Sequence, residues 1–251
     1  MIISSIIDKN ILRISLDNNP VNSLSLSMLT DLSNVIDNID YDNIRCIIFD
    51  SRINHFCAGA DLKERLEFSN DDTLGFLDKI NQLYHSISEI KVPSFAFING
   101  ACLGGGLELA ISCDFRIAYK DSVFGFPETS IGVIPGAGGT QRLTRLIGHS
   151  KSLKWIFSAT KFSAEEAFVD GIVDFVIDEK NRKKFISNFV CKISKKAPLA
   201  IKAAKKSVNS AFIDHGFIKE RQEYLTTLYS EDRDEGLLAF KYNRPPNWKN
   251  K

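Results

Sequence analysis

The sequence of 251 residues predicts an α/β protein with parallel strand pairing and an all-helical C-terminal region. Short apolar runs typical of strands alternate with longer segments that carry apolar residues at helical spacing, up to about residue 178. Beyond that point only helical patterns remain. We therefore expect an α/β core over residues 1–190 and a helical oligomerisation region over residues 191–251.

The first half of the core alternates regularly between strand and helix patterns. Pro20 breaks the chain after the first strand, and Pro93 lies near the start of the third. Each helical segment has an apolar stripe, which suits packing against a sheet. The expected elements are a strand over 11–16, a helix over 25–37, a strand over 44–49, a helix over 73–90 and a strand over 92–98.

The second half of the core is punctuated by glycine. Gly148 fits the position just past a helix end. Ser163 and Glu166 form the capping-box pattern that opens a helix ending before Gly171. The other expected elements are a short apolar helix over 107–112, a helix over 140–147, and strands over 113–118, 123–126 and 172–177.

The C-terminal region shows helical patterns only. Pro198 suits the first turn of a helix. Because the core is already closed, apolar stripes here favour packing against a neighbouring subunit. The expected helices cover residues 185–194, 198–212, 213–229 and 232–242.

Composition excludes several classes of function. Hydrophobic residues make up 44% and charged residues 25% of the chain, which is ordinary for a globular protein. A net charge of +1 gives no basis for binding nucleic acid or a membrane surface, and no apolar run approaches the roughly 18 residues of a membrane helix. Five cysteines without a Cys-x-x-Cys pair and four scattered histidines predict buried free thiols and no metal site.

The N-terminus shows no recognisable targeting signal. Its first five residues have no basic region and no Arg-rich amphipathic pattern. We therefore expect a cytoplasmic protein, or a protein of the mitochondrial matrix if the chain is a processed form.

Two glycine-rich turns, at residues 56–62 and 104–106, carry most of the chemical information. Glycine permits positive φ and close backbone approach. The first N–H groups of a helix lack intrahelical partners and lie at its positive end, so such turns suit an anion or a developing oxyanion. Residues 104–106 and 136–141 both lack the third glycine of a dinucleotide fingerprint. The alternative for residues 104–106 is a tight turn that packs helix on strand.

Acidic residues stand beside these turns. Glu108 lies in a segment of otherwise small or apolar side chains with one serine. Burying an unpaired carboxylate there would cost roughly several kcal/mol of folding free energy. An exposed glutamate on a half-buried helix is the alternative. Glu128 follows Pro127, as in the first turn of a helix, and with Glu108 it becomes a candidate general acid or base. Asp61 is expected to be an N-cap, with Glu64 completing a capping box.

These motifs resemble those of the enoyl-CoA hydratase (crotonase) family, in order and over nearly the whole chain. The matching segments are residues 56–65, 103–110, 134–143 and 232–240. The resemblance implies a spiral of ββα units with a helical C-terminal region that forms a trimer, often a dimer of trimers. It also implies an acyl-CoA thioester as substrate, so that coenzyme A belongs to the substrate and no cofactor is required.

The resemblance further implies roles for individual residues. The N–H groups of Ala60 and Gly105 would hold the thioester carbonyl. Glu108 would take a proton from the water that attacks C3, and Glu128 would deliver one to C2. Because members that lack one or both glutamates usually do other chemistry, their presence implies hydration of a trans-2-enoyl-CoA to a 3-hydroxyacyl-CoA, a lyase step of fatty-acid β-oxidation. The implied substrate contacts are Val21, Asn22, Leu24, Ala58, Ala60, Asp61, Leu62, Lys63, Gly104, Gly105, Pro127 and Gly136.

Within the family, residues 58–65 and 236–246 look closest to the methylglutaconyl-CoA hydratases, which act on a branched, acidic acyl group. Those relatives include an RNA-binding member with a lysine-rich helix. The matching stretch here, 31–43, holds four aspartates and no Lys or Arg, so we expect no RNA binding. A non-catalytic scaffold would need neither glutamate. Asn243 stands where relatives often carry a lysine that reaches coenzyme A phosphates, and Lys241 or Arg244 would substitute.

Overall fold

The computed structural model describes residues 1–212 and 214–251. Its strands are β1 (Ile2–Ile7), β2 (Ile11–Leu16), β3 (Cys46–Ser51), β4 (Ser94–Ile98), β5 (Ala101–Leu103), β6 (Phe115–Tyr119), β7 (Val123–Gly125), β8 (Phe162–Ser163) and β9 (Phe175–Ile177). One sheet has the order β1-β2-β3-β4-β6-β9, and a smaller sheet has the order β5-β7-β8. Strands β2, β3, β4, β6 and β9 pair in parallel, as predicted, while β1 adds an antiparallel edge.

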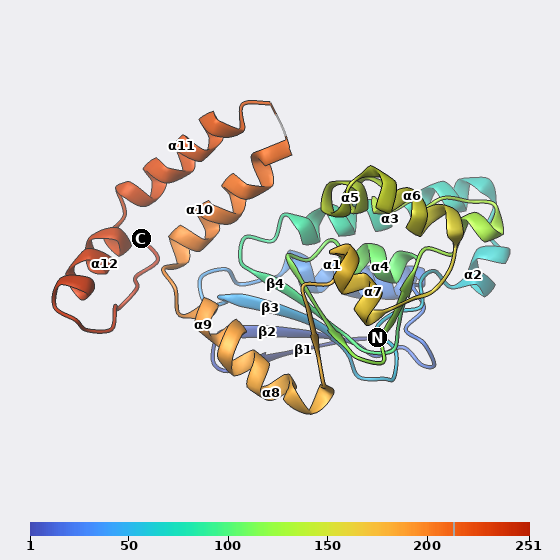
Figure 1. Ribbon diagram of the computed structural model, residues 1–251, viewed down its shortest axis with the longest axis horizontal. Helices are drawn as coiled ribbons and strands as arrows, with labels where there is room; N and C mark the ends of the chain where they lie inside the picture. Colours follow the sequence, from blue (N-terminus) through green and yellow to red (C-terminus); the bar gives the residue numbers. More distant parts are fainter. Residues whose placement is uncertain (213) are drawn as a thin grey trace.

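Helices cover both faces of the large sheet (Figure 1). Those of the core are α1 (Leu26–Asp37), α2 (Leu62–Leu66), α3 (Asn70–Ser88), α4 (Gly105–Ala110), α5 (Gly139–Ile147), α6 (His149–Ser158) and α7 (Ala164–Asp170), with a 3₁₀ turn at Glu128–Ile131. Later in the chain come α8 (Arg182–Phe185), a π turn (Ile186–Val190), α9 (Cys191–Ser194), α10 (Pro198–Asn209), α11 (Gly216–Leu228) and α12 (Glu231–Lys241).

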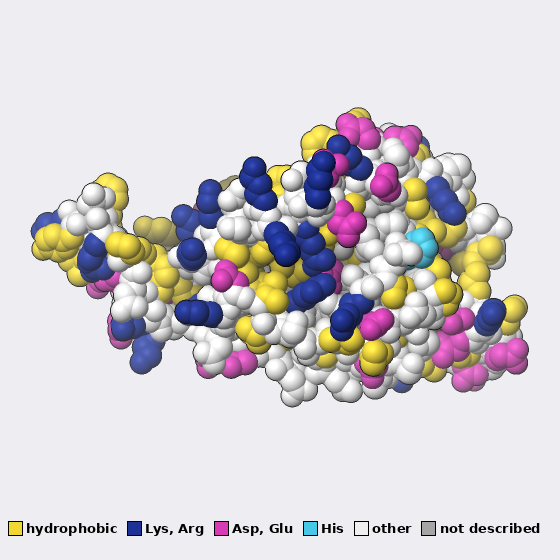
Figure 2. Space-filling view, turned by 90° about the horizontal axis from the view of Figure 1, so that it is seen from below, with side chains coloured by type: hydrophobic (Ala, Val, Ile, Leu, Met, Phe, Trp, Pro, Cys, Tyr) yellow, Lys and Arg dark blue, Asp and Glu magenta, His cyan; other side chains and the backbone are white. Residues whose placement is uncertain are grey.

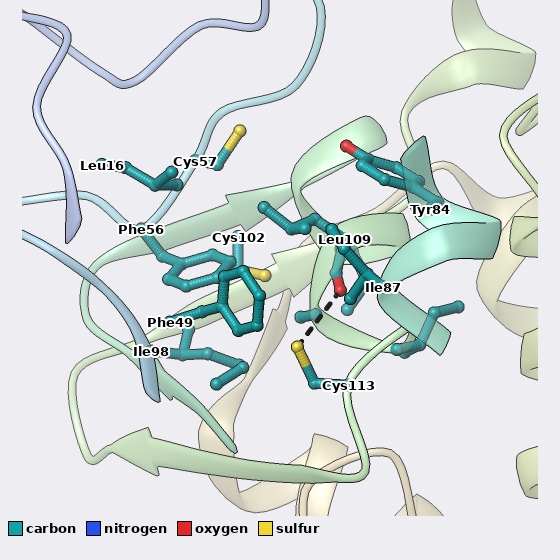
Figure 3. Close-up of a cluster of buried hydrophobic side chains, with 14 of the residues drawn as sticks. Leu16, Phe49, Phe56, Cys57, Tyr84, Ile87, Ile98, Cys102, Leu109 and Cys113 are labelled. Atoms are coloured by element: carbon teal, nitrogen blue, oxygen red, sulfur yellow. Dashed lines mark hydrogen bonds between the residues drawn. The ribbon is translucent and has the colours of Figure 1, made fainter. Parts of the chain in front are cut away.

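Two clusters of buried side chains lie on opposite faces of the large sheet. Alternate residues of a strand point to opposite faces, so Phe49 joins the cluster shared with α1 and α3, whereas Ile48 joins the one beneath α8 and α9. Figure 3 shows part of the larger cluster, in which Phe49 and Phe56 pack near Ile98 and Cys102. All five cysteines are buried free thiols, as predicted.

Several predicted boundaries move because caps and glycines set them. Helix α3 begins at Asn70 rather than residue 73, since Ser69 and Asp72 form a capping box. Helix α4 begins at Gly105, two residues earlier than predicted, and ends at Ala110. The predicted capping box of Ser163 and Glu166 is confirmed. Strands β1, β5 and β8 and helix α6 were not predicted.

One capping prediction is half wrong. The Asp61 carboxylate caps α2 by accepting from the N–H groups of Lys63 and Glu64 at 3.0 and 3.3 Å, as expected. Glu64 does not return the contact, because its carboxylate accepts from the Leu26 N–H at 3.2 Å and the Asp61 N–H donates to the Leu24 carbonyl at 3.1 Å. Glu64 therefore ties α2 to the start of α1 rather than closing a local box.

The C-terminal helices α10 to α12 project away from the sheets as an arm (Figure 1). The arm carries exposed apolar side chains, including Phe217, Tyr229 and Phe240. The predicted helix over 213–229 starts at Gly216, and residue 213 lies outside the described residues. The division at residue 190 and the oligomerisation role stay predictions. Within the described residues, no helix combines the length and apolar character needed to cross a bilayer.

Candidate active site

The two glycine-rich turns meet at the start of α4. Gly59 has a φ of 95°, and a Cβ there would lie 2.9 Å from the Leu103 carbonyl oxygen and 3.5 Å from the Gly105 nitrogen. A Cβ on Gly105 would lie 3.9 Å from the Ala60 nitrogen. Only glycine fits so close an approach. The backbone nitrogens of Ala60 and Gly105 are therefore neighbours, although they are far apart in sequence.

Both of these N–H groups are free to bind a ligand. The Leu24 N–H donates to the Gly59 carbonyl, and the Asp61 N–H donates to Leu24, so the Ala60 N–H points to the other side of its segment. The Gly105 N–H opens α4 and has no intrahelical acceptor. Across residues 1–212 and 214–251, neither N–H donates a hydrogen bond to a protein group. Two such donors side by side can share one oxygen atom that gains negative charge.

Glu108 is buried, which rules out the alternative of an exposed glutamate. Its side chain projects from α4 and the residue is only 3% exposed. Oε1 accepts from the N–H groups of Ala137 and Gly139, each at 2.8 Å. Burial raises the pKa of Glu108, while these two donors and the charge of Arg142 act against that rise.

The turn that binds Glu108 is itself held from two sides. Nη1 of Arg142 donates to the Ala137 carbonyl at 2.9 Å, and Nδ2 of Asn81 donates to the Gly136 carbonyl at 2.8 Å. The first contact comes from α5 and the second from α3. The backbone N–H groups that position the Glu108 carboxylate are thus themselves held in place by Arg142 and Asn81.

Glu128 is placed differently from Glu108. It begins the 3₁₀ turn after Pro127, as its sequence pattern predicted. Its Oε1 lies 2.9 Å from the position of a Cβ on Gly104, while its Oε2 is buried without a hydrogen-bond partner among the described residues. Burial raises the pKa of Glu128 to about 7, and the charge of Glu108 adds to the rise.

The structure brings the predicted catalytic residues together. Gly104 and Gly105 are consecutive at the start of α4, with Ala60 beside Gly105 and Glu128 beside Gly104. Glu108 lies one helical turn further along. Two N–H donors and two carboxyl groups in contrasting environments can polarise a carbonyl and exchange protons with a bound water.

The predicted substrate-binding residues divide into two groups. Segment 21–24 runs beside segment 58–61, joined by a 3.0 Å hydrogen bond from the Ala58 N–H to the Val21 carbonyl. Asn22, Leu24 and Gly104 are buried, unlike the other nine predicted residues, and substrate contact stays a prediction for all twelve. The Asn22 side chain donates to Ser51 and to two backbone carbonyls beneath the loop. The accessible predicted residues are Val21, Ala58, Ala60, Asp61, Leu62, Lys63, Gly105, Pro127 and Gly136.

The basic residues near the C-terminus are committed to local contacts. Both terminal nitrogens of the Arg244 guanidinium donate to Glu235, at 2.6 and 2.8 Å. Nζ of Lys241 lies 5.4 Å from the ring centroid of Tyr242. Contacts with coenzyme A phosphates stay a prediction for these residues.

Sequence reasoning missed the residues that support the site. Tyr84 lies on the apolar stripe of α3. Its hydroxyl could have indicated a contact, because the hydroxyl of a buried tyrosine usually finds a hydrogen-bond partner. Arg142 follows the glycine run at 136–139, and that run has no phosphate-binding pattern. The N–H groups of Ala137 and Gly139 in this run donate to Glu108. These contacts span 29 and 31 residues of sequence, so no local pattern shows them.

Comparison with known proteins finds relatives that match this chain over most of its length. Residues 7–251 match the family model described as enoyl-CoA hydratase/isomerase. The probable enoyl-CoA hydratase 2, mitochondrial, of Arabidopsis thaliana is 39% identical over 246 residues, which are 95% of this chain and 81% of that protein. The human methylglutaconyl-CoA hydratase, mitochondrial, is 38% identical over 237 residues, or 91% of this chain and 70% of that protein. The crystal structure of enoyl-CoA hydratase from Bacillus anthracis has a TM-score of 0.96 at 36% identity, covering 100% of this chain and 99% of that one.

Proposed function

Because the chain belongs to the enoyl-CoA hydratase/isomerase (crotonase) family, we propose that it is an enoyl-CoA hydratase, which adds water across the 2,3 double bond of a trans-2-enoyl-CoA. One observation carries this proposal. Two carboxyl groups, Glu108 and Glu128, flank a pair of N–H groups that have no acceptor within the described residues. An enzyme that only binds or only polarises a thioester would not need both carboxyl groups.

The thioester carbonyl accepts hydrogen bonds from the N–H groups of Ala60 and Gly105. This contact draws electron density toward the oxygen and makes C3 of the enoyl group electrophilic. Removing one donor from a comparable oxyanion hole costs about 3–4 kcal/mol of transition-state stabilisation. The coenzyme A portion would run along the accessible rim formed by Val21, Ala58 and Lys63.

The addition step requires two proton transfers. Glu108 takes a proton from water as the water oxygen bonds to C3, and the electrons of the double bond move onto the thioester oxygen. Glu128 then gives a proton to C2 as the carbonyl re-forms, which leaves the 3-hydroxyacyl-CoA. The transferred protons return through exchange with solvent. Each positioned acid or base contributes about 10²–10⁴-fold to the rate.

The environments of the two glutamates support this division of roles. Burial raises the pKa of Glu108, but two backbone N–H donors act against that rise by stabilising the ionised form that a base requires. Glu128 has a buried oxygen without a partner and a pKa raised to about 7 by burial, so it holds a proton more readily near neutral pH. Neighbouring carboxyl groups with contrasting environments are typical of an acid and base pair.

The test is the rate of crotonyl-CoA hydration by the wild type and by Glu108→Gln and Glu128→Gln. Glutamine keeps the shape of each side chain but cannot exchange the proton. We expect each variant to keep the wild-type oligomeric state and to lose at least about 100-fold in kcat. Wild-type-like rates in both variants would overturn the assignment.

A second acyl class is favoured by Arg65 in α2. Its guanidinium carbon lies 4.6 Å from the ring centroid of Phe76, and within the described residues it forms no ion pair or side-chain hydrogen bond. Phe76 is one helical turn from Ile80, whose Cδ1 lies 3.7 Å from the position of a Cβ on Gly105. A cation without an ion-pair partner, connected to the Gly105 turn through Phe76 and Ile80, favours an acyl group that ends in a carboxylate, as in 3-methylglutaconyl-CoA.

The two acyl classes are separated by kcat/KM on crotonyl-CoA, a long-chain enoyl-CoA and 3-methylglutaconyl-CoA, each with the wild type and Arg65→Gln. If Arg65 binds a carboxylate, the variant loses about tenfold or more on 3-methylglutaconyl-CoA and keeps its rate on crotonyl-CoA. An equal loss on both substrates would assign Arg65 to packing and leave a simple enoyl-CoA as substrate.

Assembly and compartment belong to the proposal as well. The exposed apolar residues of the α10–α12 arm support a homo-oligomer, a trimer or a dimer of trimers. The names of the plant and human relatives include the word mitochondrial, whereas the compartment of this chain stays a prediction.

A further inference from the structure

We infer that Tyr84 is a positioning residue of the oxyanion hole: its hydroxyl holds the Gly105 carbonyl and thereby ties the residue that provides the Gly105 N–H to α3. The inference rests on the proposed function, because it concerns the N–H pair assigned there to the thioester oxygen. Tyr84 does not touch the substrate. It acts through the backbone of Gly105.

The contact is short and deeply buried. Tyr84 is fully buried in α3, and its Oη donates to the Gly105 carbonyl oxygen at 2.7 Å. Figure 3 shows its ring in the cluster of α3 and α4, on the same helix as Ile87 and near Leu109. Burial raises the pKa of Tyr84 well above its ordinary value, so the hydroxyl keeps its proton and remains a donor.

The start of α4 has no side-chain cap. Gly104, at the N-cap position, has a φ of 52° and provides no side-chain hydrogen bond. Gly105 has no side chain to anchor it, and a Cβ there would lie 2.8 Å from Cδ1 of Leu24. A glycine pair is the most permissive backbone available. The peptide that carries the Gly105 N–H is held at its carbonyl end, because the Gly104 carbonyl accepts from the N–H groups of Leu107 and Glu108 at 2.8 and 3.0 Å.

Two further hydrogen bonds hold the adjoining peptides, one on each side. The Gly104 N–H donates to the Gly125 carbonyl at 2.9 Å, and the Gly105 carbonyl accepts from Tyr84 at 2.7 Å. The first bond joins the turn to the smaller sheet. The second depends on one hydroxyl of α3 and ties Gly105 to that helix. Tyr84 is thus the side chain that fixes the position of Gly105, and with it the Gly105 N–H, relative to α3.

Loss of this restraint should affect the transition state more than the bound substrate. The thioester oxygen carries little charge in the substrate and a large partial charge in the enolate-like transition state, so a misaligned donor weakens the second state more. A neutral hydrogen bond contributes about 0.5–1.5 kcal/mol, which corresponds to about 2–13-fold. We expect Tyr84→Phe to lower kcat by about this factor and to leave KM within about twofold.

The experiment combines crotonyl-CoA hydration with a probe that needs no turnover. Acetoacetyl-CoA forms an enolate with a distinct ultraviolet absorbance, and an oxyanion hole lowers the pH at which the bound molecule enolises. Tyr84→Phe should bind acetoacetyl-CoA but enolise it at a higher pH than the wild type does. Tyr119→Phe is the matched control, because Tyr119 is a buried tyrosine on the opposite face of the sheet, near Arg182.

The outcomes are distinct. A fall in kcat with an upward shift in the enolisation pH, absent from the Tyr119 variant, supports the inference. If the wild type hydrates crotonyl-CoA and both tyrosine variants behave alike, the inference is overturned and the proposed function stands. If the wild type does not hydrate crotonyl-CoA, the proposed function is overturned and the inference falls with it. Failure of Tyr84→Phe to fold would show that the hydroxyl serves folding and would also overturn the inference.

Discussion

Replacing Glu128 by glutamine is expected to stabilise the protein at alkaline pH while it stops turnover. The carboxyl group of Glu128 is buried against Gly104, one of its oxygens has no hydrogen-bond partner in the described structure, and Glu108 lies nearby. Such a site disfavours the ionised form. Under the proposed function, this carboxyl group is costly to bury in the charged state but is needed for proton transfer.

The sign and size follow from the pKa of Glu128. Burial raises this pKa from 4.5 to about 7 in the folded protein, so between these values the folded state binds more protons than the unfolded state, and stability falls as pH rises. At about 1.36 kcal/mol per pH unit the full shift corresponds to about 3 kcal/mol. Because the side chain is partly exposed to solvent, we expect about half of this, roughly 1.5 kcal/mol.

The assay is urea unfolding of the wild type and Glu128→Gln at about pH 5 and about pH 8, at fixed protein concentration. The variant should gain stability relative to the wild type as pH rises. Glu166→Gln is the control, because hydrogen bonds from Ser163 lower the pKa of that exposed carboxylate and place its titration below this range. A stability difference between the wild type and Glu128→Gln that is independent of pH would refute the reasoning.

Two glycine substitutions give further predictions. Gly139→Ala places a Cβ 2.7 Å from Oε1 of Glu108 and 2.8 Å from Pro135, so it should displace the carboxylate and lower kcat on crotonyl-CoA by at least about tenfold, with little change in KM. Gly75→Ala meets nothing within 4 Å in the middle of α3, so it should raise the free energy of unfolding by about 0.5–1 kcal/mol and leave kcat unchanged. Loss of stability in Gly75→Ala, or normal turnover in Gly139→Ala, would contradict these expectations.

The sequence contained most of the fold because its elements are locally encoded. Strand β2 matches its alternating pattern from Ile11 to Leu16, and Ser25 caps α1 where the pattern placed the helix start. The paired glycines and the isolated Glu108 also indicated a buried site. Local patterns and a resemblance over nearly the whole chain led to the same family.

What the sequence did not show depends on long-range contacts. Glu64 looked like half of a capping box but bonds to Leu26, which lies 38 residues away. Asn22 and Leu24 stand in a loop beside the proposed coenzyme A path, yet both side chains turn inward to support it. The sequence also did not show where the charges lie. Its net charge is only +1, yet Lys and Arg side chains gather on the face seen in Figure 2.

The most direct test of the central claim is the source of the oxygen in the product. Crotonyl-CoA is incubated in ¹⁸O-labelled water with the wild type and with the double variant Glu108→Gln/Glu128→Gln. The mass of the product is then measured by mass spectrometry. We predict one ¹⁸O atom in the 3-hydroxyacyl-CoA made by the wild type, and no product above background with the double variant. Labelled product formed at equal rates by both proteins, or none with the wild type, would contradict the account.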